Sequence, residues 1–214
     1  MSAVHVLPVL NVEQVSPHLD YRISDEHGNV VAQVDQTAGP RPGWWKRNVF
    51  GMVDHSSAVT LDARSADGAP IFRLCRDASE SKEGQNFCRL LAASGQPLGR
   101  LEKQQDEYLG FSAGLLNTPT TTFVAKYRLY GADGSLVGEA VSEPIEMRIR
   151  QGGDAVSATG DHYVISDASG QEAARLEGTT LGSPDKRFTL RFQPRLPADL
   201  RIFALATPFA MKLV

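Results

Sequence analysis

The last segment of the chain, residues 197–214, is apolar on nearly every side. Its apolar residues do not fall on one helical stripe: Ala198, Leu200, Ile202, Phe203, Leu205, Phe209, Met211 and Leu213. A helix that is apolar all round must be surrounded by lipid or by protein, because no face of it is suited to water. This segment therefore constrains what the rest of the chain can fold into.

The length and charge of the segment distinguish these environments. A membrane-spanning helix needs about 20 mostly uncharged residues. Asp199, Arg201 and Lys212 fall inside the segment, so the uncharged run 202–211 is about half of a span. Pro208 would also remove one backbone hydrogen bond from a helix. A helix that plugs a closed sheet is therefore favoured over a tail inserted into lipid and over a tail that binds a partner.

The sequence before this segment consists mainly of predicted β-hairpins. In each hairpin, two runs of alternating apolar and polar residues flank a turn with Gly beside Asp, Asn or Ser. These turn residues tolerate the positive φ that a tight hairpin requires, and the alternation is typical of half-buried strands. The predicted hairpins cover residues 21–34, 58–75, 87–101, 123–141 and 162–176, with turns at Gly28, Gly68, Gly95, Gly134 and Gly170.

Two further segments, 145–150 and 188–193, also alternate and bring the predicted strands to twelve. Strands with one apolar face need no second sheet if they close into a barrel, and closure removes exposed edges. A barrel of twelve strands would be hollow, because about eight strands already fill an interior with side chains. The prediction is a single mostly β domain, residues 1–214, in which a closed twelve-stranded antiparallel barrel of five hairpins and two strands encloses the apolar C-terminal helix, residues 197–214.

The remaining segments are predicted to lie outside the regular pattern. Residues 1–19 are interpreted as an N-terminal extension, with a short extended piece and a helical turn at 11–16. Three longer connections, 36–57, 105–122 and 151–160, interrupt the hairpins. Long loops on a rigid scaffold are where binding residues usually lie.

Five hairpins followed by a lone apolar helix resemble the superfamily of tubby C-terminal domains, phospholipid scramblases and LURP-one-related proteins, in a bacterial-type member. The resemblance covers residues 20–214 and is carried by 21–34, 123–141, 162–176 and the ending Arg201-Ile-Phe-Ala-Leu-Ala-Thr-Pro-Phe-Ala. It implies a twelve-stranded barrel around a central helix. It implies function only loosely, since tubby domains bind phosphoinositide headgroups, scramblases act on phospholipids with calcium, and LURP-one-related proteins have no settled activity. The chain lacks the acidic loop of a calcium site and shows no lysine/arginine site that matches the tubby one residue by residue.

The most unusual local composition lies in the first long connection. Both tryptophans of the chain, Trp44 and Trp45, are adjacent there and precede Lys46 and Arg47. This combination suits a membrane interface, where indole lies at headgroup level and the cations meet phosphate. It would equally suit a protein or ligand contact, or a Trp that folds under the loop and caps the barrel. These four residues are the predicted ligand- or membrane-binding site.

Cations that alternate along the predicted strands give a second candidate. If these strands lie close together, the cations would form a patch that binds anionic headgroups. The alternative is an ordinary solvated barrel exterior. The members of this secondary cationic patch are Lys126, Arg128, Arg148, Arg150, Lys186, Arg187 and Arg191.

The histidines show no pattern typical of catalysis or metal binding. They have neither HExxH nor i,i+4 spacing: His5, His18, His27, His55 and His162. The adjacent residues Asp54, His55 and Ser56 cannot form the hydrogen-bonded chain of a catalytic triad. No catalytic residue, metal or cofactor is therefore predicted.

Composition narrows the class of partner and the compartment. The net charge of -3 argues against a nucleic-acid binder, which would usually be basic. The N-terminus shows no charged-then-apolar leader, so a cytoplasmic protein is expected. Cys75 and Cys88, which flank residues 76–87, are expected to be reduced and to face the core; a disulfide across the hairpin is the alternative.

Together these features predict a non-catalytic binding module for a phospholipid headgroup at a membrane surface or for another small ligand. An anionic phospholipid or a protein is the expected partner, without a transmembrane span, and the lipid alternative places the protein peripherally on the membrane. Two other functions stay open. One is a hydrolase-type enzyme that uses His55 or His162 from separate loops; the other is a protein–protein interaction or structural module. The oligomeric state is not predicted.

Overall fold

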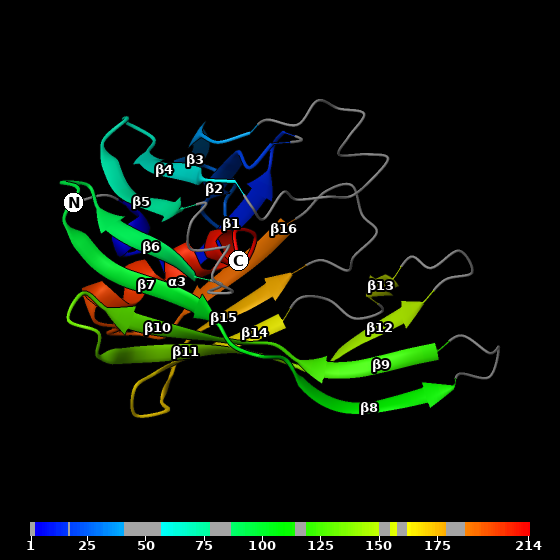
Figure 1. The fold of residues 1–214 in the computed structure, drawn as a ribbon. Coiled ribbons are helices and arrows are strands. Elements are labelled where there is room, and N and C mark those ends of the chain that lie inside the picture. The colour runs from blue at the N-terminus through cyan, green and yellow to red at the C-terminus, as the bar shows by residue number, and fades with distance from the viewer. Residues whose placement is uncertain are drawn as a thin grey trace.

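The computed structural model of the chain describes residues 3–16, 18–40, 57–77, 87–113, 119–149, 155–157, 162–178 and 187–214. Among these residues, twelve strands form a closed antiparallel barrel around the C-terminal helix α3 (Ala198–Ala210), as Figure 1 shows. The predicted architecture, a mostly β chain with a barrel that encloses an apolar helix, is therefore confirmed.

The order of the strands around the barrel follows the hairpins. The ring runs β1 (Val9–Gln14), β16 (Arg187–Phe192), β15 (Glu172–Gly178), β14 (His162–Asp167), β11 (Leu136–Ser142), β10 (Lys126–Gly131), β7 (Pro97–Lys103), β6 (Phe87–Ala92), β5 (Pro70–Arg76), β4 (Val59–Ser65), β3 (Val30–Ala38) and β2 (Tyr21–Ser24). The five predicted hairpins correspond to β2–β3, β4–β5, β6–β7, β10–β11 and β14–β15, and all are confirmed. A short 3₁₀ helix, η1 (Ala3–His5), precedes β1.

Four more strands form a second sheet, which the sequence did not predict. They are β8 (Glu107–Ala113), β9 (Pro119–Val124), β12 (Ile145–Ile149) and β13 (Ala155–Ser157), in the order β13-β12-β9-β8. Figure 1 shows this sheet projecting to the right of the barrel. The predicted connections 105–122 and 151–160 thus contain strands.

The twelfth strand of the barrel is also different from the predicted one. The predicted strand 145–150 was expected to complete the ring, but its described part, β12, pairs with β9 and β13 in the second sheet. Its place is taken by β1, which lies in the predicted N-terminal extension and pairs with both β16 and β2. The predicted helical turn at 11–16 is therefore wrong. Leu10 and Val12 alternate into the core, and burial of these two side chains favours a strand.

The five hairpin turns share one geometry. Their glycines, Gly28, Gly68, Gly95, Gly134 and Gly170, have φ between 82° and 85°. Each glycine N–H donates to the carbonyl three residues before it, as from Gly134 to Gly131 at 3.0 Å, and the ladder beside each turn shifts register. This is a type I turn closed by a left-handed glycine, a common three-residue hairpin. In the fourth turn, Asp133 Oδ1 accepts the N–H of Ser135 at 2.9 Å, and its bonds with Ser135 hold the pKa of Asp133 below its usual range.

The hairpins give the barrel two different ends. All five glycine turns lie at one end, which we call the turn end. The other end, which we call the loop end, carries the second sheet and the residues where strands meet the longer connections, such as Ala38, Arg76, Lys103 and Gly178. A barrel built in this way concentrates its longer connections at the loop end.

Helix α3 runs through the lumen from the turn end to the loop end. The side chains of Leu200, Phe203 and Phe209 are all buried, as predicted. The Phe209 ring contacts the ring of Tyr21 edge-on, at a centroid distance of 5.0 Å, and that of Phe72 at 6.3 Å. The apolar character of the helix on all sides is explained by this enclosure, because the barrel wall surrounds it.

A buried arginine forms hydrogen bonds near each end of helix α3. At the turn end, Arg201 of α3 donates from Nε to the Val4 carbonyl at 3.1 Å and from a terminal nitrogen to the Leu7 carbonyl. Its guanidinium lies 3.9 Å from the centroid of the Phe192 ring, and burial lowers the pKa of Arg201. At the loop end, Arg76 of β5 donates to the carbonyls of Leu213 and Ser57. These bonds satisfy backbone carbonyls that would otherwise be buried without partners.

His5, in η1, is expected to make stability depend on pH. Burial and the nearby Arg201 lower the pKa of His5 from its ordinary value of 6.5. As the pH falls below 6.5, the unfolded chain binds a proton at His5 before the folded protein does, so the free energy of unfolding decreases toward the lower folded pKa. Urea unfolding of His5→Gln between about pH 7.5 and 5 should show a weaker pH dependence than the wild type. The exposed-turn variant His27→Gln is the control, and equal slopes for His5→Gln and the wild type would contradict the expectation.

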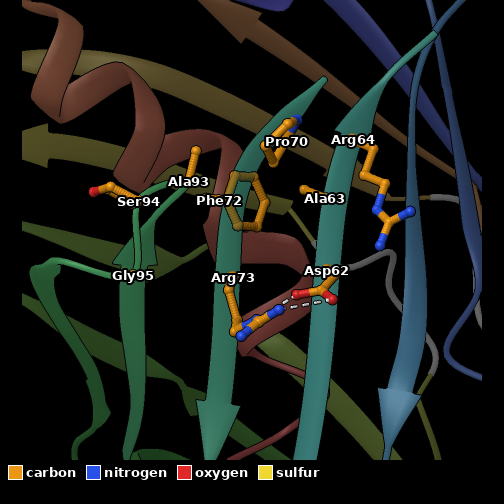
Figure 2. A pocket seen from close by; sticks show the side chains of 10 residues that line it. Asp62, Ala63, Arg64, Pro70, Phe72, Arg73, Ala93, Ser94 and Gly95 are labelled. Carbon is orange, nitrogen blue, oxygen red and sulfur yellow. Dashed lines mark hydrogen bonds and ion pairs between the residues drawn. The ribbon is translucent and has the colours of Figure 1, made fainter. Parts of the chain in front are cut away.

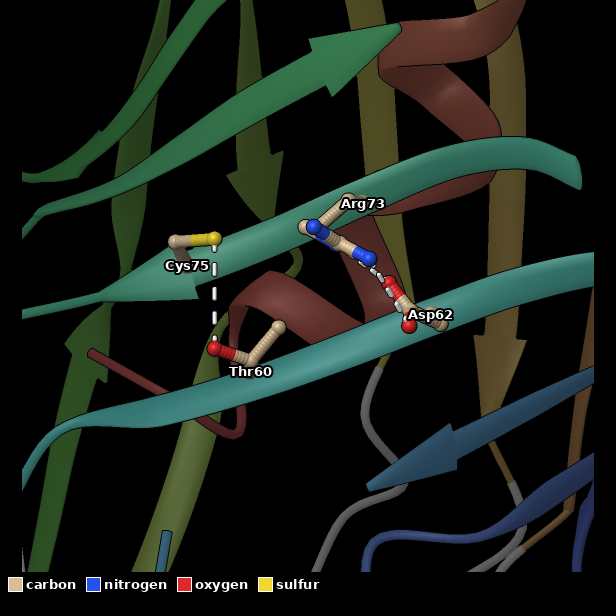
Figure 3. A network of polar contacts seen from close by, with 4 residues as sticks. All are labelled: Thr60, Asp62, Arg73 and Cys75. Carbon is tan, nitrogen blue, oxygen red and sulfur yellow. Dashed lines mark hydrogen bonds and ion pairs between the residues drawn. The ribbon is translucent and has the colours of Figure 1, made fainter. Parts of the chain in front are cut away.

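The two cysteines lie on opposite faces of the barrel wall. Cys75 of β5 pairs with Arg89 of β6, so Cys88 is offset by one position and faces inward, where it is buried. Cys75 faces outward, beside Thr60 (Figure 3). Neither cysteine is part of a disulfide, but the expectation that both face the core is wrong for Cys75 because successive strand residues alternate between faces.

Candidate functional site

The predicted binding residues Trp44, Trp45, Lys46 and Arg47 lie outside the described residues. The strands that flank them, β3 and β4, meet their connection at Ala38 and Val59, which belong to the loop end. The second sheet lies at the same end of the barrel (Figure 1).

The predicted cationic patch is divided between separate parts of the fold. Lys126 and Arg128 lie on β10, and Arg187 and Arg191 lie on β16, with β11, β14 and β15 between them. Arg148 lies in β12 of the second sheet, and its two remaining partners, Arg150 and Lys186, lie outside the described residues. The structure therefore does not bring the described cations to one place.

The three arginines of that set that lie on the barrel form ion pairs along its exterior. Arg128 pairs with Glu139 at 3.1 Å, Arg187 with Glu13 at 2.9 Å and Arg191 with Glu177 at 3.4 Å. All three arginine side chains are about half exposed, so each pair contributes little stability. Their charge is compensated locally, which leaves little net positive charge for an anionic ligand.

A small cavity lies at the loop end, between the end of α3 and the barrel wall. It has a volume of about 110 Å³ and is lined by Tyr127, Tyr163, Leu176, Phe188, Pro208, Met211 and Lys212. The rings of Tyr127 and Tyr163 meet edge-on at a centroid distance of 6.0 Å. Lys212 places its Nζ 5.4 Å from the centroid of the Phe188 ring. We call this space the mouth cavity.

A second hollow lies on the barrel wall near the turn end. Figure 2 shows this groove, which has a volume of about 210 Å³ and is lined by Asp62, Ala63, Arg64, Pro70, Phe72, Arg73, Ala92, Ala93, Ser94 and Gly95. The guanidinium of Arg73 donates two hydrogen bonds to the Asp62 carboxylate, one of them from a terminal nitrogen to Oδ2 at 3.1 Å. This contact lowers the pKa of Asp62.

This ion pair has a structural origin. Asp62 and Arg73 are direct cross-strand partners in the β4–β5 ladder, and Thr60 and Cys75 form the next such pair on the same face (Figure 3). Opposite charges in this position stabilise a sheet by pairing across strands. Two charged residues of the groove, Asp62 and Arg73, are thus paired with each other within the barrel wall.

Neither hollow resembles the site of an enzyme that acts on a drug-sized substrate. Their volumes of about 110 and 210 Å³ lie below the roughly 300 Å³ at which such pockets begin. No histidine is among the described residues that line either one, and His55 lies outside the described part of the chain. In the part of the chain that the structure describes, no three potential metal ligands cluster. The described cavities therefore do not supply the nucleophile–base pair that the hydrolase alternative requires.

The second sheet exposes large apolar side chains. The register aligns Tyr108, Phe123 and Ile145 across three strands, and the rings of Tyr108 and Phe123 lie 6.3 Å apart. Ile145 is buried and Phe123 packs against the barrel core, whereas Tyr108 is 71% exposed. Farther along β8, Leu109 at the bulge is 52% exposed and Phe111 is 69% exposed. We call Tyr108, Leu109 and Phe111 the β8 patch.

The sequence contained a signal for this sheet. Residues 105–122 were expected to form a long connection. The run Thr120-Thr121-Thr122-Phe123 is rich in residues that favour strands, and Tyr108 and Phe111 precede it at a spacing that suits a hairpin. This pattern would have identified β8 and β9, but not the exposure of the patch.

Among the described residues, no helix has both the length and the apolar character needed to cross a bilayer. A comparison of the chain with protein-family models, with curated proteins and with solved structures found no match in any of the three.

Proposed function

We propose that this protein is a non-catalytic binding module that attaches peripherally to anionic membrane surfaces through its loop end. The observation that carries the proposal is the β8 patch, three exposed apolar side chains on a sheet that projects from the barrel. Exposed apolar patches mark interaction sites, and tyrosine is enriched at the interface between membrane and water. The connection that contains Trp44 and Lys46 begins and ends at the same end of the barrel.

The expected binding energy requires both apolar and charged contacts. Complete burial of a large apolar side chain contributes about 1.5–3 kcal/mol, and three side chains that are only partly immersed contribute about 4–6 kcal/mol in total. This corresponds to a dissociation constant of about 0.04–1 mM, which is too weak for stable attachment. Each Lys or Arg near an anionic surface adds about 1 kcal/mol, so Lys46 and Arg47 would provide the second signal that peripheral attachment needs.

Vesicle co-sedimentation tests this proposal. We expect the protein to pellet with vesicles of phosphatidylcholine and phosphatidylserine and to pellet less with phosphatidylcholine alone. The double variants Tyr108→Ser/Phe111→Ser and Trp44→Ala/Trp45→Ala should each lower the apparent affinity by about tenfold or more, because each loses apolar contacts worth more than about 1.4 kcal/mol.

The matched control removes exposed apolar side chains from the opposite end of the barrel. Val6 and Leu136 are exposed and lie at the turn end, so Val6→Ser/Leu136→Ser should pellet like the wild type. Wild-type pelleting no higher than that of the Trp44/Trp45 variant would reject the proposal. Equal loss in the turn-end control would show that pelleting reflects general surface hydrophobicity.

A protein partner is the second candidate, and the edge of the second sheet favours it. In the described part of that sheet, β8 has β9 as its one neighbouring strand. The strand Glu107–Ala113 contains neither Lys nor Pro, the residues with which proteins usually protect an exposed edge. An extended segment of another chain could pair with it. If the protein fails to bind vesicles but light scattering gives a mass above 23.2 kDa for the chain, this candidate would replace the first.

A further inference from the structure

Strand β8 has an edge with little protection against pairing with another chain. It is the outermost strand of the projecting sheet, and in the described part of the chain no strand pairs with its outer side (Figure 1). Proteins usually protect such an edge with Lys, Pro, inward-pointing charges or a bulge. The strand Glu107–Ala113 has only the bulge, at Leu109, and Glu107 is its one charged residue. An edge of this kind can accept an extended segment of a partner.

The bulge places the large apolar side chains of β8 on one face of the sheet. Tyr108 opposes Phe123 and Phe111 opposes Thr121, and these two β9 residues are two positions apart. Side chains two positions apart on a strand share a face, so Tyr108 and Phe111 also share one. The hydrogen bonds of a strand pair lie in the plane of the sheet, so the edge of β8 can pair while this face stays exposed.

The sequence of β8 is complementary to itself in antiparallel pairing. When a two-fold axis passes beside Gly110, the middle residue of the strand, every residue of β8 has a partner in the second copy. Leu109 then opposes Phe111 of the other copy on both sides of the axis, and apolar cross-strand pairs stabilise a sheet. The two copies of Glu107 lie at opposite ends of the pair, about 20 Å apart at about 3.3 Å per residue, which exceeds the Debye length of about 8 Å. No like charges are therefore opposed.

We propose that the partner of β8 is a second copy of this chain, paired edge to edge about a two-fold axis at Gly110. The second sheets of the two copies then form one continuous sheet, with both β8 patches side by side on one face. A self-complementary patch that contacts its own copy is the usual basis of a two-fold dimer. The inference rests on the second candidate function, in which a protein pairs with the β8 edge, and it does not require membrane attachment.

Light scattering of the full chain at increasing concentration tests for the dimer. A pair of short strands buries less than the roughly 800 Å² per partner of a standard interface, so we expect a dissociation constant of about 10–100 μM. The mass should rise from 23.2 kDa toward twice that value over this range. A mass that stays at 23.2 kDa up to about 1 mM would overturn the proposal. No vesicles are present in this measurement, so its outcome is independent of the co-sedimentation result.

Disulfide crosslinking tests the register of the pair. In a Cys75→Ser background, Gly110→Cys should form an intermolecular disulfide under mild oxidation, because directly opposed Cα atoms lie about 4.5–5.5 Å apart and a disulfide spans about 4.4–6.8 Å. A Cβ at Gly110 would meet nothing within 4 Å, so the substitution is accommodated. Tyr108→Cys is the matched control, since its two copies would lie about 13 Å apart. Equal crosslinking of the two variants, or none for Gly110→Cys, would overturn the proposal.

Two charge variants test whether residues 109 and 111 oppose each other. Leu109→Lys/Phe111→Lys places lysines opposite lysines and should weaken dimerisation at least about tenfold. Leu109→Lys/Phe111→Glu removes the same apolar side chains but places Lys opposite Glu twice, so it should restore dimerisation to within about tenfold of the wild type. Circular dichroism confirms that both variants are folded. Equal weakening in the two variants, or wild-type dimerisation of the double-lysine variant, would reject the proposal.

Discussion

Replacement of Phe209 by alanine is expected to lower the free energy of unfolding by about 3–5 kcal/mol. The Phe209 side chain is 0% exposed and contacts the rings of Tyr21 and Phe72. Its removal loses the transfer free energy of an aromatic ring and leaves a cavity in the lumen. Because the barrel wall is held by a closed ladder of hydrogen bonds, it cannot collapse readily into that cavity.

Urea unfolding followed by circular dichroism measures this effect, and Phe111→Ala is the matched control. It makes the same chemical change at a side chain that is 69% exposed, so we expect a change within about 0.5 kcal/mol. A loss below about 1 kcal/mol for Phe209→Ala would mean that the helix is not a packed part of the barrel core.

Replacement of Gly99 by alanine is expected to lower the free energy of unfolding by about 3 kcal/mol, although it adds only one methyl group. Gly99 lies in β7 with a φ of 154°. A Cβ at this position would overlap the carbonyl oxygen of Tyr130 in β10 and would lie 2.7 Å from Cζ of Phe203 in α3. The backbone of β7 or the helix would have to move, and both are fixed by packing.

Gly110→Ala is the control for this prediction. It makes the same substitution in a strand, but a Cβ at Gly110 would meet nothing within 4 Å. Its effect should stay within about 0.5 kcal/mol. If thermal unfolding shows equal midpoints for the two variants, the close approach of Phe203 to the barrel wall is not a constraint on this fold.

Features of this fold that depend on neighbouring residues or on the composition of one segment could be predicted from the sequence. The hairpins were predictable because each depends on a few neighbouring residues, such as Asp133 and Gly134, that favour one turn geometry. The burial of α3 was predictable because Leu200, Phe203 and Phe209 leave no polar face for water. In both cases the decisive energy is local or depends on composition alone.

The positions of β1 and β12 were not predictable in this way. Segments 9–14 and 145–149 both alternate, and alternation does not state which strand a segment pairs with. β1 joins the ring because its register with β16 and β2 buries Leu10 and Val12. That choice depends on contacts across nearly the whole length of the chain.

The candidate site also combines a feature that is visible in the sequence with features that depend on long-range contacts. The residue types of the Trp44–Arg47 loop suggested a function from composition, and that function stays a prediction. The sequence by itself determined five hairpins and an apolar helix that must be enclosed, because turn chemistry and hydrophobicity act between near neighbours or on a segment as a whole. Only the tertiary structure brought Tyr127, Tyr163, Phe188 and Lys212 around one cavity and left Tyr108 and Phe111 exposed, because the closure of the barrel decides which distant segments meet.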